Sequence, residues 1–131
     1  MGRVLRVPRM HDKIAWFSFD DLCKQPLSAI DYLGITDNFH TVFIHSIPDL
    51  DVHKNGNEMR RFITLIDILY EGHIRTICSA ESLPHLIYIK QDVKGRDEEE
   101  SFAFDRTVSR LLEMQSKTYL EEHATKYSLT H

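Results

Sequence analysis

The sequence has little of what marks a disulfide-rich, membrane-spanning or nucleic-acid-binding protein. Its two cysteines, Cys23 and Cys78, lie far apart and form no C-x-x-C motif, so we expect two free, buried thiols in a reducing compartment. No apolar run approaches the ~20 residues of a membrane span, and the start carries no secretory signal pattern. The 16 Lys and Arg against 20 Asp and Glu give a net charge of −4, which disfavours affinity based on neutralising phosphates.

The first 35 residues contain signals for two strands and two short helices. Two β-type runs, at residues 3–7 and 14–19, flank a polar segment that is expected to form a hairpin or a loose turn. The S-x-x-D spacing of a capping box then occurs twice, at Ser18 and Ser28, and each predicts a helix start. We expect the second helix to direct three apolar side chains toward the core, namely Ile30, Leu33 and Ile35.

The middle of the chain has the pattern of a β-α-β unit. Residues 41–46 and 74–79 are compact apolar strands, and residues 58–71 have one apolar stripe at helical spacing. Gly72 is expected to supply a left-handed helix stop. Strands joined by a helical crossover should be parallel, and their apolar character predicts burial on both faces. The predicted fold class is therefore α/β, with a small, mainly parallel sheet and packed helices.

The last third is predicted to contain a loop, a helix and a tail. Residues 85–89 indicate a helical turn or a short strand. The acidic stretch 92–101 is expected to be a solvated loop. A helix is predicted over residues 104–122, so that one domain unit spans residues 1–122 and residues 123–131 form a flexible tail.

The patterns that hold nucleotides or metals are absent from the sequence. No pair of the five glycines has the spacing of a phosphate loop or of a dinucleotide fingerprint. No apolar strand ends in an acidic pair for Mg²⁺. The eight histidines show no zinc-ligand spacing, so we interpret them as scattered surface or half-buried imidazoles.

Ser79 and four arginines are the other candidates for chemistry. Ser79 follows a strand but lacks a G-x-S-x-G elbow, so we interpret it as a turn residue. The arginines form two pairs on helices, Arg60 with Arg61 and Arg106 with Arg110. Either pair could reach a phosphate on a neighbouring domain or subunit. Surface ion pairing with Glu113 or the acidic loop is the stronger alternative, and such pairs contribute only about 0–1 kcal/mol.

Several uncommon strings occur in one order along residues 3–120. They are AWFSFDDLC (15–23), PLS (26–28), DYL (31–33), FHT (39–41), IP (47–48), RRFITLID (60–67), YE (70–71), SAE (79–81) and FDRTVSRLLEMQS (104–116). In these strings the chain closely resembles the C-terminal part of the ATPase-family-gene-1-like AAA+ ATPases, a family that includes lactation-elevated-protein-like and ZapE-related members. The resemblance therefore implies part of a P-loop AAA+ domain.

The family resemblance also implies a function and a cellular location. It implies ATP binding and hydrolysis with Mg²⁺, and a role in mitochondrial protein quality control that acts on mitochondrial protein substrates. The implied location is the mitochondrion, or the cytoplasm if the chain is bacterial. The Walker A and Walker B sequences of the family lie upstream of the matched region, so no catalytic or metal-binding residue can be assigned here. Arg61, Arg106 and Arg110 remain as nucleotide-facing or inter-subunit candidates.

Three hypotheses follow from these observations. The leading one is a C-terminal fragment of such an ATPase, which is inactive alone and has no cofactor of its own. Its expected partner is the upstream ATPase half or a full-length homologue, and the assembly can be a homo-oligomer. The second is a stand-alone, non-catalytic protein-interaction module. The genomic sequence upstream of Met1 separates these two, because only the first requires a G-x-x-x-x-G-K-[ST] motif there. The third is a hydrolase that uses Ser79 with a histidine.

Overall fold

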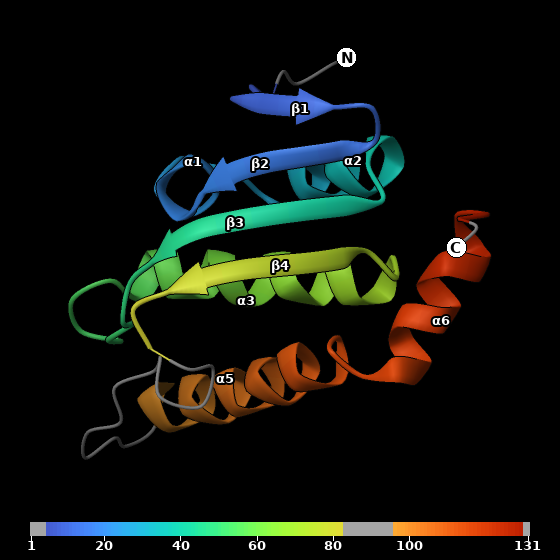
Figure 1. The fold of residues 1–131 in the computed structure, drawn as a ribbon. Helices are drawn as coiled ribbons and strands as arrows, with labels where there is room; N and C mark the ends of the chain where they lie inside the picture. The colour runs from blue at the N-terminus through green and yellow to red at the C-terminus, as the bar shows by residue number, and fades with distance from the viewer. Residues whose placement is uncertain (1–4, 83–95, 130–131) are drawn as a thin grey trace.

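The chain folds as an α/β unit, as predicted. The computed structural model describes residues 5–82 and 96–129. The elements are β1 (Arg9–His11), β2 (Ile14–Ser18), α1 (Phe19–Cys23), α2 (Ala29–Asn38), β3 (Thr41–Ile47), α3 (Gly56–Glu71), β4 (Arg75–Ala80), α5 (Arg96–Glu113) and α6 (Lys117–Lys126). They form a four-stranded sheet in the order β1-β2-β3-β4 with helices beside it (Figure 1).

The sheet is mixed, with three parallel strands. β2 pairs with β3, and β3 with β4, in parallel, so the predicted β-α-β unit is confirmed with α3 as its crossover. β1 pairs antiparallel with β2 through a two-residue turn at Asp12 and Lys13. The predicted first strand at 3–7 is wrong in its described part, because residues 5–7 are outside any strand and the hairpin begins at Arg9.

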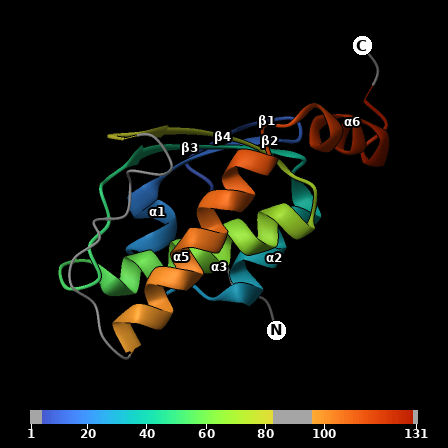
Figure 2. The same ribbon diagram turned by 90° about the horizontal axis from the view of Figure 1, so that it is seen from below.

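The helices α1, α2, α3 and α5 lie on one side of the sheet (Figure 2). Among the described residues, only α6 borders the opposite side, at one end of the sheet. The alternation of strand side chains explains this layering. Ala15 and Phe17 of β2 and Val42 and Ile44 of β3 point toward the helices and are almost completely buried. They join a core that α3 dominates, with Met59, Phe62, Leu65, Ile66 and Leu69. The expectation that β3 and β4 are buried on both faces is therefore wrong.

α2 packs with a different face from the expected one. Ile35 is buried as predicted, but Ile30 and Leu33 are 71% and 49% exposed. Tyr32 takes the core position instead, because its hydroxyl donates a 2.7 Å hydrogen bond to the buried carbonyl of Leu22. The two capping boxes are confirmed at the starts of α1 and α2.

α3 ends in a left-handed residue, but that residue is His73 rather than Gly72. Gly72 has φ −80° and His73 has φ 53°. The Ile74 amide donates to the Leu69 carbonyl at 3.0 Å, which is the six-residue closure of a Schellman-type helix end. Close approach disfavours a side chain at Gly72, since a Cβ there would lie 3.2 Å from Cγ2 of Thr36 and 3.3 Å from the Ile68 carbonyl.

The C-terminal region differs from the prediction in both of its boundaries. Residues 96–101 open α5, so this part of the expected acidic loop is helical, and its negative charge suits a helix N-terminus. The single helix expected over 104–122 is broken at Met114–Ser116, where Ser116 caps α6. α6 extends to Lys126, so the beginning of the expected tail is helical too. The predictions for residues 85–89 and 92–95 lie outside the described residues.

Two further features concern the cysteines and membranes. Both thiols are free, as expected, with Cys23 buried and Cys78 exposed rather than buried. Burial raises the pKa of the Cys23 thiol, so this side chain stays a neutral thiol. Within the described part of the chain, no helix has the length and apolarity to cross a membrane.

Candidate functional site

The carboxyl ends of the parallel strands are the first place to look for a site, because open α/β sheets bind ligands there. β2 leads directly into α1, whose N-terminus is closed by its own side chains. The Ser18 amide donates to Oδ2 of Asp21 at 2.8 Å, and the Asp21 amide donates to Oγ of Ser18 at 3.0 Å. A carboxylate therefore occupies the position at which a helix N-terminus would receive a phosphate.

The loop between β3 and α3 is also closed by internal hydrogen bonds. Asp51, only 4% exposed, accepts from the His53 amide at 2.9 Å, and its own amide donates to Oδ1 of Asn55 at 2.6 Å. Asn55 in turn donates to the Asp49 carbonyl at 3.2 Å. These contacts consume backbone amides that a phosphate cradle would need, and they place acidic groups beside the strand ends.

ATP and Mg²⁺, which the family resemblance implies, do not fit these residues. A triphosphate requires free amides and cations, whereas the strand ends present Asp21, Asp49 and Asp51 with their local hydrogen bonds. Among the residues that the structure describes, no group of three His, Cys, Asp or Glu side chains could hold a metal ion. No step of ATP hydrolysis can therefore be built from the described strand ends.

Ser79 lies within β4, next to its last residue, so the interpretation of Ser79 as a turn residue is wrong. It lines a groove of about 550 Å³ together with Glu81, Phe62 and Met114, and no histidine is among the described residues of this groove. Within residues 5–82 and 96–129, no hydrogen bond joins Ser79 to a histidine. The described geometry thus supplies no base for a serine nucleophile.

The candidate arginines are placed in three different environments. The Arg61 guanidinium donates through Nη1 to the carbonyl of Cys23 at 2.9 Å, and so ties α3 to the end of α1. Arg110 on α5 forms an ion pair with Asp67 of α3, and its guanidinium lies 5.3 Å from the centre of the Tyr70 ring. Arg106 is exposed on α5. The structure therefore does not bring the three arginines into one cluster.

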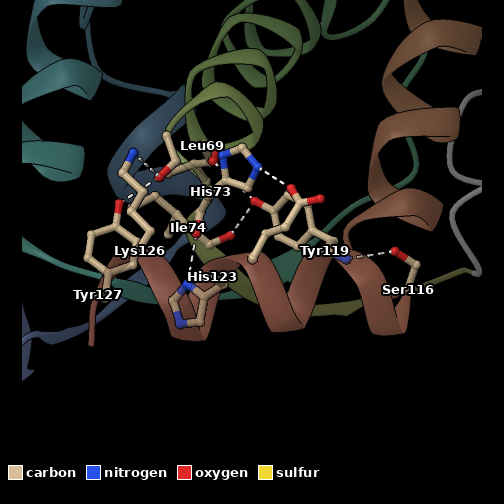
Figure 3. A network of polar contacts seen from close by, with 10 residues as sticks. Leu69, His73, Ile74, Ser116, Tyr119, His123, Lys126 and Tyr127 are labelled. Carbon is tan, nitrogen blue, oxygen red and sulfur yellow. Dashed lines mark hydrogen bonds and ion pairs between the residues drawn. The ribbon is translucent and has the colours of Figure 1, made fainter. Parts of the chain in front are cut away.

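A network of polar contacts joins α6 to the end of α3 (Figure 3). The Tyr119 hydroxyl donates to the Ile74 carbonyl at 2.7 Å and approaches the Leu69 carbonyl at 3.4 Å. Burial raises the pKa of Tyr119, so the hydroxyl keeps the proton that it donates. The ring also stacks on His73, with centroids 5.4 Å apart.

His123 completes the buried part of this network. Its Nδ1 lies 2.7 Å from the His73 carbonyl, which requires a proton on Nδ1. Its Nε2 is buried and has no hydrogen-bond partner among the described residues. Burial lowers the pKa of His123, since a charged imidazolium would lose its hydration there. His123 is therefore held neutral.

The outer contacts converge on two further groups. Lys126 and Tyr127 both donate to the Gly72 carbonyl, at 3.0 and 2.6 Å, while His73 Nε2 lies 2.8 Å from Oε2 of Glu122 (Figure 3). Four of these side chains donate to carbonyls at or just beyond the end of α3, and Glu122 pairs with the His73 ring. We call this set the α6 clamp; it consists of Tyr119, Glu122, His123, Lys126 and Tyr127.

The α6 clamp is the arrangement that the sequence analysis missed. A signal was present, because Tyr119, His123 and Tyr127 are four residues apart and so share one face of a helix. The prediction of a flexible tail from residue 123 concealed it. The chemistry of the clamp is that of hydrogen bonding to backbone carbonyls, so its direct effect is to fix α6 against the sheet.

Comparison with known proteins identifies the family of the chain. Residues 1–123 match the family described as AFG1-like ATPase. This range includes the whole sheet and the first part of the α6 clamp. A search of solved structures gives no significant match.

Three curated relatives have similar sequences. An uncharacterized protein of Schizosaccharomyces pombe is 34% identical over 91% of this chain and 31% of its own length. Lactation elevated protein 1 homolog B of Danio rerio is 34% identical over 90% of this chain and 28% of its own. Cell division protein ZapE of Escherichia coli is 39% identical over 81% of this chain and 26% of its own.

The chain thus spans about a quarter to a third of the length of these relatives. The resemblance stated from the strings along residues 3–120 is confirmed, because the family match covers almost the same range. The chain belongs to the AFG1-like ATPase family.

Proposed function

We propose that this chain acts as a non-catalytic, C-terminal portion of an AFG1-like AAA+ ATPase and that a different region binds ATP and Mg²⁺. The observation that carries the proposal is the combination of a family match over residues 1–123 with strand ends that present acidic groups and closed amides. Phosphoryl transfer depends on cations and amides placed around the phosphates. The chain alone is therefore expected to be inactive toward ATP.

The cellular role follows from the family resemblance. The proposed role is mitochondrial protein quality control, with mitochondrial protein substrates, and the proposed location is the mitochondrion, or the cytoplasm for a bacterial chain. The relatives that support a wide distribution come from a fission yeast, a fish and a bacterium. The proposed partner is the nucleotide-binding half of an AFG1-like ATPase, in an assembly that can contain several copies.

The three candidate arginines differ in whether their side chains bind groups of this chain or are exposed. Arg61 and Arg110 donate to groups of this chain, Cys23 and Asp67. Arg106 is exposed on α5 and could reach a phosphate on a neighbouring subunit. We therefore favour Arg106 as the inter-subunit candidate, while Arg61 and Arg110 position α3 against its neighbours.

A titration with ATP and Mg²⁺ tests the proposal. The purified chain should show neither saturable binding at micromolar ATP nor release of phosphate. The same chain mixed with the nucleotide-binding part of a relative should leave the ATP site of that part intact, and Arg106→Ala should then lower turnover without changing the melting temperature of the chain. Micromolar binding and turnover by the chain alone would contradict the proposal.

The alternative is a stand-alone interaction module without chemistry. The side of the sheet opposite α3 and α5 (Figure 2) favours this reading as well, because Trp16, Phe43 and Ile77 are half-buried there and an uncovered apolar sheet face is a common docking surface. The sequence encoded upstream of Met1 distinguishes the two. A phosphate-loop motif there supports the ATPase portion, and its absence supports the module.

A further inference from the structure

The open side of the sheet carries a row of apolar side chains. Trp16, Phe43 and Ile77 are aligned across β2, β3 and β4 in the strand register. All three are only half-buried, and none belongs to the core cluster on the other side of the sheet. A contiguous apolar surface of this kind is costly to leave in water and points to a binding surface.

The Trp16 and Phe43 rings of this row stack on each other, so their edges rather than their faces point toward solvent. Trp16 and Phe43 stack with centroids 5.1 Å apart and an interplanar angle of 9°. Arg9 covers the other side of the indole, with its Cζ 4.9 Å from the ring centre. Because β1 and β3 flank β2, Arg9 and Phe43 occupy opposite ring faces. Bases bind by stacking on a free ring face, so this arrangement suits packing by apolar side chains rather than by single-stranded nucleic acid.

A groove continues the row toward α6. Its volume is about 390 Å³, and Phe43 and Ile77 line it from the sheet while Leu120 and Ala124 line it from α6. Arg75 also lines the groove and can meet a negative group of a bound segment. The α6 clamp anchors this wall of the groove to the end of α3.

The charge of this face is opposite to that of the whole chain. Strand alternation and register place one set of residues on it: Arg9, His11, Ile14, Trp16, Ser18, Thr41, Phe43, His45, Arg75, Ile77 and Ser79. These strand positions include two arginines and no carboxylate, whereas the chain has a net charge of −4. An acidic segment with apolar side chains is the complementary occupant.

The lengths of the relatives indicate where such a segment comes from. In each of them this region is only 26–31% of one polypeptide, so the rest of that polypeptide is covalently linked to this region and is available as an occupant. The match over residues 1–123 includes all four strands and the groove wall up to His123.

We propose that the open sheet face binds the remaining part of an AFG1-like ATPase through an acidic, apolar segment, with Trp16, Phe43 and Ile77 at the centre of the contact and Arg9 and Arg75 beside it. The inference rests on the proposed function, and it adds the surface through which the two parts associate. Apolar side chains supply affinity at the centre, and the arginines favour the correct partner and its orientation.

Trp16 permits a direct test, because it is the only tryptophan in the sequence. The probes are the parts of the S. pombe, D. rerio and E. coli relatives outside the matched region, each produced as a separate polypeptide. Titration into this chain should shift the tryptophan emission to shorter wavelength and saturate with at least one probe. Ile77→Lys and Arg75→Glu should each weaken this binding by about tenfold or more.

Two matched variants serve as controls. Ile30→Lys changes an apolar residue that is 71% exposed on α2, and Arg60→Glu reverses a charge on α3, both on the helix side of the sheet. Both should bind the probe like the unchanged chain. Circular dichroism verifies that each variant is folded, and Arg75→Glu, at an exposed position, keeps the test valid if Ile77→Lys unfolds.

Four outcomes would overturn the inference. The first is the absence of binding with all three probes, and the second is binding that Ile77→Lys and Arg75→Glu leave unchanged. The third is an emission shift when the chain alone is concentrated, which would identify a second copy as the occupant. The fourth is an emission change with a single-stranded oligonucleotide. Insensitive binding rejects this surface but retains the proposed function. ATP turnover by the chain alone rejects the proposed function without affecting the mapped surface.

Discussion

Arg61 donates a hydrogen bond to the backbone carbonyl of Cys23, 38 residues earlier in the chain, across 2.9 Å. The contact closes the C-terminal end of α1, where the helix has no basic residue in its last turn. A guanidinium is suited to this task because its charge is permanent and favours the negative end of a helix. The arginine that the sequence offered for nucleotide contact therefore also has an internal architectural contact.

Replacing Arg61 should lower stability. Arg61→Met keeps most of the apolar length but removes the donor to Cys23, and the loss should be about 1–3 kcal/mol in the free energy of unfolding. Denaturant unfolding followed by circular dichroism measures it. Arg60→Met is the matched control, since Arg60 bonds to Asn57 on its own helix at an exposed site. Equal losses for both variants would contradict this role.

Removing the Tyr119 hydroxyl should weaken the α6 clamp. Tyr119→Phe keeps the ring contacts and deletes the 2.7 Å hydrogen bond to the Ile74 carbonyl, so this carbonyl loses its closest side-chain donor. The expected cost is about 1–3 kcal/mol of unfolding free energy. Lys126→Met, which removes an exposed donor to Gly72, should cost less than about 1 kcal/mol. Hydrogen exchange at α6 should rise selectively in Tyr119→Phe, and unchanged exchange would be evidence against the clamp.

His123 should make the folded chain sensitive to mild acid. Burial lowers its pKa below the ordinary value of 6.5, with His40, His73 and Arg75 adding repulsion. The unfolded chain then binds a proton that the folded chain resists, so the stability contribution is complete above about pH 6.5 and is lost as the pH falls through the depressed pKa.

His123→Asn isolates this effect, because the amide can still donate to the His73 carbonyl but does not titrate in this range. Unfolding free energies of both proteins measured from pH 8 to pH 5 should converge or cross at low pH, with the steeper fall in the unchanged chain. Parallel curves would show that another group dominates the acid sensitivity.

The buried face of α2 can be tested by two substitutions of the same residue type. Ile35→Ala empties a site that is 1% exposed and should cost about 2–5 kcal/mol. Ile30→Ala changes a side chain that is 71% exposed and should stay within about 0.5 kcal/mol. Melting temperatures of the two variants provide the comparison. A large loss in Ile30→Ala would restore the face predicted from the sequence.

Sequence patterns within a few residues correctly predicted the helix starts and the helix that depend only on neighbouring residues. The Ser18 and Ser28 capping boxes require only residues three positions apart, and the apolar stripe of α3 requires only helical spacing. Both were readable from the sequence. The absence of a phosphate-loop motif is likewise a property of the sequence.

Features that depend on distant partners were predicted incorrectly or missed. The buried side of α2 includes Tyr32, whose hydroxyl reaches the Leu22 carbonyl, and the carbonyls of Gly72 and His73 at the end of α3 are bound by side chains from α6. The α6 clamp joins residues about 50 positions apart. No local pattern specifies such a pairing.

By itself, the sequence determined the α/β class, the family and the β-α-β order, because each arises from composition, spacing or strings along the chain. Only the tertiary structure decided which side of the sheet is covered. Both faces of β2 and β3 carry apolar side chains. Because α3 and α5 dock on one side only, Phe17 is buried in the core and Trp16 is half-exposed to solvent. Burial depends on what lies opposite a residue in space, and that is settled only when the layers assemble.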